Sequence, residues 1–486
     1  MIGSKNVSSQ AITARSEDYS RWYTDVIQRA ELADYAPVRG CMIIKPYGYA
    51  LWEHIQQQLD RRFKDTGHEN AYFPLFIPEE FIMKEKDNFE GFSPELAVVT
   101  IGGGEVLEQR LVVRPTSEAI IGHSFSNWIH SYRDLPLLIN QWANVVRWEM
   151  RTRLFLRTME FLWQEGHTAH ATHDEAEEET LKMLGVYADF AINEAAIPVI
   201  QGRKSNQERF AGALRTYSIE AMMGDKKALQ SGTSHNLGQG FAKAFDIKYS
   251  DRGNQLQHCW TTSWGLSTRM IGGIIMTHGD DQGLRMPPRL APIQVIIVPI
   301  YKNDDEKSKV MEAVDALFAE LKGAGLRVRV DVREDLTPGF KFNDWEMRGV
   351  PVRVEIGPKD VQNNAAAVAR RDVPGKAGKQ FVPREGLVER IKALLVEIQA
   401  NLLAQATAFR DANIHPVEND YARFREIIKD GWAYTWFCGG AECEAKIKED
   451  NQAVSRCFPL DQEKGEGKCI HCGAPATERA YFAKAY

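Results

Sequence analysis

The residues with the clearest potential for chemistry lie between Arg114 and His167, where arginines and glutamates are interspersed with apolar and aromatic runs. Arg147 and three further arginines fall within eleven residues, and the flanking segments 137–139 and 161–163 are apolar enough to be buried strands. Two such strands joined by an arginine-rich loop predict a hairpin that holds cations over a pocket. Guanidinium groups suit phosphate oxygens because they are planar and always charged. A hairpin tip that is charged only for solubility would explain the arginines equally well.

Three glutamates in this stretch, Glu118, Glu149 and Glu165, stand in apolar or aromatic company. A carboxylate in such a place needs a partner or a substrate cation, which favours a pocket over a solvated tip. Thr116 also looks like the cap of a helix that runs to about residue 132, so Thr116 and Glu118 could serve that first turn alone.

These residues resemble known motifs. Arg147-Trp148-Glu149, with the Phe-Leu-Arg-Thr-Met-Glu-Phe that follows the loop, resembles motif 2 of the class II aminoacyl-tRNA synthetases. Arg-Pro-Thr-Ser-Glu at 114–118 and Trp-Gln-Glu-Gly-His at 163–167 are similar to the prolyl-tRNA synthetases in particular. The resemblance implies that Thr116 and Glu118 hold the secondary ammonium of proline.

Two later segments extend the resemblance. The residue types of 230–235, Gln-Ser-Gly-Thr-Ser-His, predict a polar turn, whereas the family binds ATP, magnesium and proline there. Arg269 precedes the apolar helix 270–276 and resembles the motif 3 arginine that pairs with the nucleotide phosphates, although a structural ion pair would also suit it. Earlier in the chain, the helix and proline-broken strand at 47–78 resemble motif 1, which forms the dimer interface in the family, although a core helix and an edge strand would suit the same residues.

The resemblance therefore implies a set of site residues. Arg147 and Arg269 are the expected catalytic residues. The expected proline site contains Thr116, Glu118, Arg147, Trp163, Glu165, His167 and His235. The expected ATP site contains Arg147, Glu149, Arg157, Thr158, Gln230, Thr233, Ser267 and Arg269, with Mg²⁺ bridging the phosphates.

A change of character at Ala291 predicts a second domain. Strands and helices alternate from there to residue 356, which is typical of an α/β domain. The pattern Pro338-Gly339-Phe340-Lys341-Phe342, continued to Pro351, resembles the anticodon-binding domain of the prolyl enzymes. Glu346 and Arg353 match the family's readers of guanine, with Arg370 or Arg371 as weaker candidates. Glu346 and Arg353 could instead form a surface ion pair.

Paired cysteines near the C-terminus predict a metal site. Cys438 and Cys443, then Cys469 and Cys472, have the spacing of a closed tetrahedral zinc site, which would be structural because no position is left for water. Four reduced core cysteines are the alternative, and Cys457 and His471 are spare ligand candidates.

The composition indicates an ordinary globular protein, with 44% apolar and 26% charged residues. A net charge of −6 means that any RNA contact must come from local basic patches. No apolar run approaches the ~20 residues of a membrane span, and the polar N-terminus lacks the apolar core of a signal peptide. We expect a cytoplasmic location.

Together these features predict an α/β multidomain protein: a flexible tail (1–15), a class II catalytic domain with an antiparallel sheet (16–290), an α/β anticodon-binding domain (291–400) and a small α+β zinc-binding domain (401–486). Only about 60 residues separate His167 from Leu229, too few for an editing insertion. The chain thus resembles the short archaeal and eukaryotic-like form, which attaches L-proline to tRNA(Pro) through a prolyl-adenylate. A homodimer and a separate editing protein are the expected partners. Synthetases for threonine, histidine or glycine, a non-catalytic RNA-binding paralogue and a polymerase accessory factor are the alternatives.

Overall fold

The computed structural model describes residues 12–84, 96–462 and 465–486. Most of the predicted N-terminal tail lies outside these ranges. At its end, Thr13 donates two hydrogen bonds to Asp25, and the backbone N–H of Arg15 donates to Asp281 at 2.8 Å.

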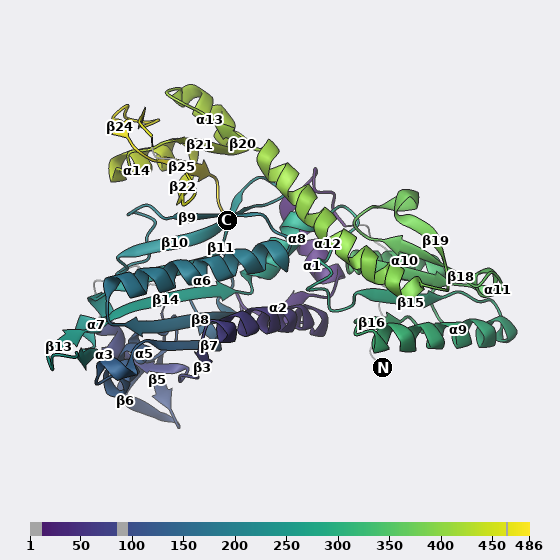
Figure 1. The fold of residues 1–486 in the computed structure, drawn as a ribbon, viewed down its shortest axis with the longest axis horizontal. Helices are drawn as coiled ribbons and strands as arrows, with labels where there is room; N and C mark the ends of the chain where they lie inside the picture. Colours follow the sequence, from purple (N-terminus) through teal and green to yellow (C-terminus); the bar gives the residue numbers. More distant parts are fainter. Residues whose placement is uncertain (1–11, 85–95, 463–464) are drawn as a thin grey trace.

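An eleven-stranded sheet forms the centre of the described molecule, in the order β20-β21-β25-β22-β9-β10-β11-β14-β8-β7-β3 (Figure 1). Its neighbours are antiparallel except for the outermost pairs, β3–β7 and β20–β21. C-terminal strands therefore continue the sheet that N-terminal strands begin, through the pairing of β22 with β9. The strands are β3 (Glu69–Asn70), β7 (Leu137–Val146), β8 (Glu160–His170), β9 (Val199–Arg203), β10 (Arg215–Met222), β11 (Ala228–Gly238), β14 (Trp260–Ser267), β20 (Ile414–Pro416), β21 (Trp432–Trp436), β22 (Val454–Pro459) and β25 (Arg479–Ala483).

Helix α6 crosses this sheet and contacts β8, β9, β10, β11 and β14 (Figure 1). It begins at a capping box, in which Thr172 accepts from the backbone N–H of Glu175 at 3.2 Å. Close packing also shapes β8: a Cβ on Gly166 would lie 2.1 Å from ring atoms of Trp264 on β14, so only glycine fits there. Besides α6 (His173–Asn193), the α-helices in the described residues up to 278 are α1 (Tyr19–Arg29), α2 (Pro46–Asp65), α3 (Glu79–Met83), α5 (Glu118–Trp128), α7 (Gly240–Ala244) and α8 (Arg269–His278).

A five-stranded sheet in the order β16-β15-β17-β18-β19 forms a separate α/β unit. Its apolar core lies between the sheet, α9 and α12, and α12 continues from this unit to the C-terminal region (Figure 1). Its elements are β15 (Val295–Pro299), α9 (Asp304–Gly323), β16 (Val328–Val330), α10 (Pro338–Met347), β17 (Val352–Ile356), α11 (Pro358–Gln362), β18 (Ala365–Arg370), β19 (Lys379–Pro383) and α12 (Leu387–Ala412).

The smaller elements complete the described chain. Two helices, α13 (Tyr421–Lys429) and α14 (Ala441–Asn451), belong to the C-terminal region. The remaining strands form small sheets: β1 (Ala33–Tyr35) with β2 (Met42–Ile44); β4 (Phe76–Pro78) and β5 (Ala97–Gly102) with β6 (Glu105–Val113); β12 (Lys248–Ser250) with β13 (Leu256–His258); and β23 (Gly467–Lys468) with β24 (Pro475–Ala476).

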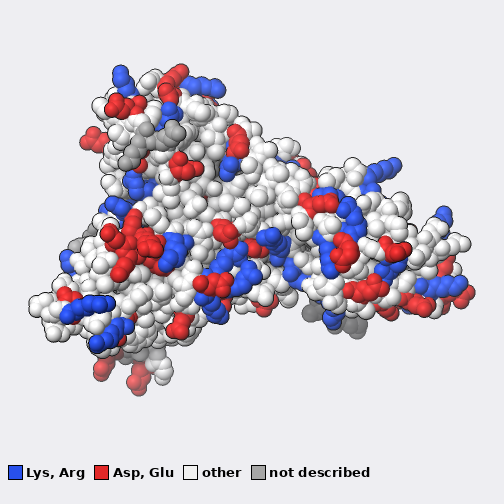
Figure 2. All heavy atoms as spheres, viewed as in Figure 1, with Lys and Arg blue, Asp and Glu red and all other residues white. Residues whose placement is uncertain are grey.

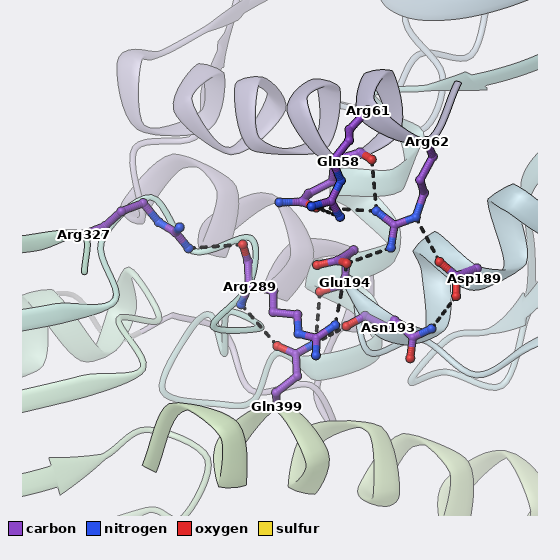
Figure 3. Close-up of polar contacts among 9 residues, drawn as sticks. All are labelled: Gln58, Arg61, Arg62, Asp189, Asn193, Glu194, Arg289, Arg327 and Gln399. Carbon is purple, nitrogen blue, oxygen red and sulfur yellow. Dashed lines mark hydrogen bonds and ion pairs between the residues drawn. The ribbon is translucent and has the colours of Figure 1, made fainter. Parts of the chain in front are cut away.

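A polar cluster joins the α/β unit to the part of the molecule built on the central sheet. It lies where α2, the end of α6 and α12 meet (Figure 3). Glu194, 5% exposed, accepts from Arg62 at 2.7 Å and lies 3.6 Å from the guanidinium of Arg289. Gln399 of α12 donates to the carbonyl oxygens of Asn193 at 2.9 Å and Glu194 at 3.1 Å. Because a buried carboxylate that loses its partner is costly, these contacts fix the α/β unit against the central sheet.

Two local predictions were wrong. The segment 230–235 is part of strand β11, hydrogen bonded to β10 on one side and β14 on the other, and is not a turn. Thr116 does not cap α5: the N-cap is Ser117, which makes no side-chain capping bond, and Thr116 Oγ1 instead donates to the carboxylate of Glu118.

Figure 2 shows acidic and basic side chains interspersed on one face of the molecule, as the small net charge predicts. In the described part of the chain, no helix has the length and apolar character needed to cross a bilayer.

Candidate functional site

A cavity of ≈ 270 Å³ opens on the central sheet, among β8, β11, β14 and the first turn of α5. Antiparallel neighbours place alternate side chains of each strand on the same face, which gathers residues far apart in sequence. The cavity is lined by Thr116, Glu118, Arg147, Phe161, Trp163, Glu165, His167, Glu208, Phe210, Thr216, Gln230, Ser231, Gly232, Thr233, His235, Ser263, Trp264, Gly265, Leu266, Ser267 and Arg269.

A buried hydrogen-bond network holds the floor of the cavity. Glu165 accepts from Ser117 Oγ at 2.5 Å and Gln141 Nε2 at 2.7 Å, and His167 Nε2 lies 2.9 Å from its other oxygen. Burial opposes charge on both members of the Glu165–His167 pair. The hydrogen bond and the mutual attraction nevertheless raise the pKa of His167 and, with Ser117 and Gln141, lower the pKa of Glu165. Contact between the two side chains therefore favours the charged form of each.

Glu118 is the carboxylate that faces the cavity from α5. It is 7% exposed and accepts the hydroxyl proton of Thr116. It stands in the first turn of α5, at the positive end of the helix dipole. A small cationic group in the cavity would therefore meet a preorganised anion and a hydroxyl oxygen.

Two arginines line the same cavity as Glu118. Arg147 Nε donates to the carbonyl of Pro115 at 3.1 Å, and its guanidinium lies 5.4 Å from the ring centroid of Trp163. Arg269, which begins α8, donates to the carbonyl oxygens of Leu156 at 3.2 Å and Gln230 at 3.5 Å. Burial and the neighbouring arginines lower the pKa of Arg269 to about 10, so it keeps its charge at neutral pH. Fixed cations beside a carboxylate suit a substrate that carries both an ammonium and a phosphate.

His235 of β11 also lines the cavity. Burial and the charges of His167 and Arg147 lower the pKa of His235 to about 3, so this ring is neutral. Its Nδ1 lies 2.9 Å from Thr216 Oγ1, and the ring of Phe210 lies 4.7 Å away. Three lining residues carry a side-chain donor that is buried without a hydrogen-bond partner in the described residues: Trp163 Nε1, Ser263 Oγ and Trp264 Nε1. Such groups are expected where a ligand binds.

Eleven of the predicted substrate residues line this cavity together. Glu149, Arg157 and Thr158 do not line it. They belong to the loop between β7 and β8, where the Arg157 guanidinium lies 3.6 Å from the carboxylate of Glu149 and Thr158 Oγ1 donates to the carbonyl of Glu160. Thr116, Glu118, Arg147, Trp163, Glu165, His167, Gln230, Thr233, His235, Ser267 and Arg269 are the eleven.

Sequence reasoning missed part of the cavity wall. Glu208 and Phe210 come from the connection between β9 and β10, and none of the family motifs described above lies in that connection. The packing of Phe210 on His235 depends on strand pairing, so no local signal could have found it.

The residues predicted to read the anticodon line a second cavity of ≈ 240 Å³. Glu346 of α10 and Arg353 of β17 form an ion pair at 2.6 Å, and Arg353 also lies 3.1 Å from Glu355 and over the ring of Phe342. The predicted ion pair thus exists, within a cavity that basic side chains surround. The lining includes Gln282, Glu346, Arg353, Arg370, Arg371, Lys376 and Lys379.

The four predicted metal ligands come together in the C-terminal region. The thiols of Cys438, Cys443, Cys469 and Cys472 all lie within 4.8 Å of one another. Sγ of Cys438 is 3.8 Å from that of Cys443 and 3.9 Å from that of Cys472. A tetrahedral zinc with Zn–S bonds of about 2.3 Å needs sulfurs about 3.8 Å apart. The cluster therefore fits Zn²⁺.

Three protein-family descriptions match successive parts of the chain. They are "tRNA synthetase class II core domain (G, H, P, S and T)" over residues 104–278, "Anticodon binding domain" over 294–394, and "Prolyl-tRNA synthetase, C-terminal" over 421–486.

Similar proteins cover almost the whole chain. The proline--tRNA ligase of Roseiflexus castenholzii is 59% identical over 479 residues, which are 98% of this chain and 99% of that protein. The chloroplastic/mitochondrial proline--tRNA ligase of Arabidopsis thaliana is 58% identical over 484 residues, or 99% of this chain and 89% of that protein. A crystal structure of prolyl-tRNA synthetase from Cryptosporidium parvum, complexed with halofuginone and AMPPNP, has a TM-score of 0.94 at 39% identity and covers 98% of this chain and 99% of that chain.

Proposed function

The chain belongs to the prolyl-tRNA synthetase family and is a class II synthetase that charges proline onto tRNA, and we propose the following roles for its residues. One observation carries them: a single cavity holds the carboxylate of Glu118 and the guanidinium groups of Arg147 and Arg269. The first suits the ammonium of an amino acid, and the other two suit its carboxylate and the phosphates of ATP.

Proline binds with its ring amine toward Glu118 and Thr116. Glu165 and His167 shape the floor beneath it, because their buried ion pair leaves neither side chain free to turn away. Trp163 and His235 enclose the ring, and the unpartnered indole N–H of Trp163 is available to a substrate oxygen. A neutral His235 adds no repulsion to the ammonium.

The activation of proline by ATP depends more on how the two substrates are positioned than on a reaction of any side chain. The proline carboxylate attacks the α-phosphate of ATP, which gives prolyl-adenylate and pyrophosphate. A ribose hydroxyl at the 3′ end of tRNA then attacks the carbonyl carbon of the adenylate, which forms the prolyl ester and releases AMP. Arg147 and Arg269 stabilise the charge that develops at the α-phosphate, without reorganising because backbone carbonyls already hold them. Gln230, Thr233 and Ser267 complete the nucleotide site, and Mg²⁺ bound with ATP would neutralise part of the phosphate charge. AMPPNP in the Cryptosporidium structure supports this nucleotide site.

The motif 2 loop completes the adenine side. Glu149, Arg157 and Thr158 stand outside the cavity lining, but they lie on the loop that follows Arg147, and we place them against the nucleotide. Their exposed fractions leave room for this: the side chains of Arg157 and Glu149 are 50% and 23% exposed.

Two other regions of the chain bind the tRNA and stabilise the fold. Glu346 and Arg353 read guanine edges of the anticodon, supported by Arg370 and Arg371 in the same cavity. Cys438, Cys443, Cys469 and Cys472 hold a structural Zn²⁺, supported by their mutual distances. The division into 16–290, 291–400 and 401–486, a homodimer, a separate editing protein and a cytoplasmic location remain proposals that rest on the family resemblance.

Aminoacylation of a tRNA(Pro) transcript tests these roles. The purified chain should transfer radiolabelled proline to the transcript, and the Arg147→Ala variant should not, while it keeps the thermal stability of the wild type. Transfer by Arg147→Ala at the wild-type rate would remove the central role proposed for that guanidinium.

A further inference from the structure

The segment 204–214 connects β9 to β10 and forms one wall of the amino-acid cavity through Glu208 and Phe210. It contains turns but neither helix nor strand, so its shape depends on the contacts that hold its two ends. The end that leads into β10 is held by the central sheet. There the backbone N–H of Phe210 donates to Thr216 Oγ1 at 3.0 Å, and that of Leu214 donates to the carbonyl of Asn236 at 2.8 Å.

The end that leaves β9 is held at Lys204 by the central sheet, where its backbone N–H donates to the carbonyl of Thr216 at 2.8 Å, and at Ser205 by the C-terminal region. Ser205 Oγ donates to Glu444 Oε1 at 3.0 Å and accepts from the backbone N–H of Glu208 at 3.2 Å. Ser205 is 1% exposed and Glu444 is 3% exposed, so water does not compete for these bonds. A hydroxyl whose proton is committed to a carboxylate presents its lone pairs in a fixed direction. Glu444 thereby determines where the N–H of Glu208 is held.

Glu444 is itself held in place. It follows Cys443, one of the four clustered thiols, in the first turn of α14, and it accepts a second hydrogen bond from Ser455 of β22. Hydrogen bonds to a charged acceptor are shorter and stronger than neutral ones. An unbroken series of contacts thus leads from the cysteine cluster, through Glu444 and Ser205, to the wall of the cavity.

We propose that Glu444 is a positioning residue for the amino-acid site: it holds Ser205 so that Glu208 and Phe210 form the wall of the proline cavity. The inference rests on the proposed binding of proline in that cavity. If Glu444 has this role, the C-terminal region affects the affinity for proline, although the described lining residues of the cavity all come from segments between 116 and 269.

The test uses the full-length, zinc-loaded protein and measures ATP–pyrophosphate exchange, zinc content and Tm. Glu444→Ala and Ser205→Ala each remove one partner of the bond, whereas Ser205→Thr keeps the hydroxyl. Glu442→Ala, at an exposed position on the same helix, is the matched control. We expect Glu444→Ala and Ser205→Ala each to raise the KM for proline about 5- to 20-fold, as the loss of a charge-assisted bond allows, with the KM for ATP, the zinc content and Tm close to wild type.

Two further results separate positioning from general stability. Ser205→Thr, which keeps the hydroxyl, should have the wild-type KM for proline. The double variant Ser205→Ala/Glu444→Ala should have a KM for proline no higher than that of either single variant, because both substitutions break the same bond. An unchanged KM for proline in folded Glu444→Ala overturns the proposal. A loss of zinc or Tm together with a rise in both KM values also overturns it, because Glu444 would then act on the fold. Absence of proline-dependent exchange in the wild type would instead refute the proposed function itself.

Discussion

Replacing Glu118 by glutamine removes the negative charge of this side chain from the cavity on the central sheet and keeps an oxygen that can accept from Thr116. Glu118 is 7% exposed, so solvent screens its charge only weakly. A hydrogen bond to a charged group contributes about 1.5–3 kcal/mol. Because about 1.4 kcal/mol corresponds to a factor of ten, we expect the KM for proline to rise roughly 10- to 150-fold. The KM for ATP should stay unchanged, since the arginines proposed to bind the phosphates are untouched.

The assay is ATP–pyrophosphate exchange at saturating ATP with varied proline. Tetrahydrofuran-2-carboxylate supplies a control from the ligand side, because it has the ring and carboxylate of proline but no ammonium. It should inhibit Glu118→Gln at least as well as it inhibits the wild type, since the amide can donate to the ring oxygen. An unchanged KM for proline in folded Glu118→Gln would refute the pairing of this carboxylate with the substrate ammonium.

The remaining predictions concern other parts of the site. Arg269→Lys should lower kcat for exchange about 10²- to 10³-fold, because a point charge replaces a preorganised fork; equal kcat in the two proteins would exclude a role at the phosphate. His167 has a raised pKa in the fold, so its stabilising effect is fully present below the ordinary histidine value of 6.5 and is lost as the pH rises through the raised pKa. The Tm deficit of His167→Gln should therefore be larger at pH 5.5 than at pH 9, and a deficit that grows toward pH 9 would contradict this. Arg353→Ala should lower kcat/KM for tRNA charging about 10- to 100-fold and leave exchange unchanged; an equal loss in both assays would indicate a defect of the fold. Zinc analysis should find one ion per chain, and Cys472→Ser should lose it together with thermal stability; full stability without zinc would exclude a structural metal.

The hairpin around Arg147 was predictable from local patterns. The apolar runs at 137–139 and 161–163 became the paired strands β7 and β8, with the arginine-rich loop between them. Two short apolar runs joined by a charged loop have few arrangements other than a buried hairpin, so the structure predicted from the sequence pattern is the one observed.

The segment 230–235 shows why other parts were not predictable. Its glycine, serines and threonine favour a turn, yet it forms an interior strand because β10 and β14 offer hydrogen bonds on both sides. Strand propensity depends on such neighbours more than on the residues themselves. Its polar side chains are needed by the cavity, which explains the departure from a strand-like composition.

Contacts between segments that are far apart in the sequence also could not be predicted from it. Ser205 and Glu444 are separated by 239 positions, and neither stands in a motif. Their bond exists because β22 pairs with β9 and carries the C-terminal region to the catalytic sheet. Glu208 and Phe210 depend on the same arrangement, so only the three-dimensional structure assigns them to the cavity.

ATP–pyrophosphate exchange with separate amino acids tests the central claim most directly. The purified protein should be assayed with proline, threonine, histidine, glycine, alanine and cysteine. Exchange with proline should far exceed exchange with threonine, histidine and glycine, and only alanine and cysteine should give measurable leakage, because small differences in size discriminate weakly. Exchange with another amino acid alone would contradict the roles of Glu118, Thr116 and His167, and no exchange with any of them would contradict the account as a whole.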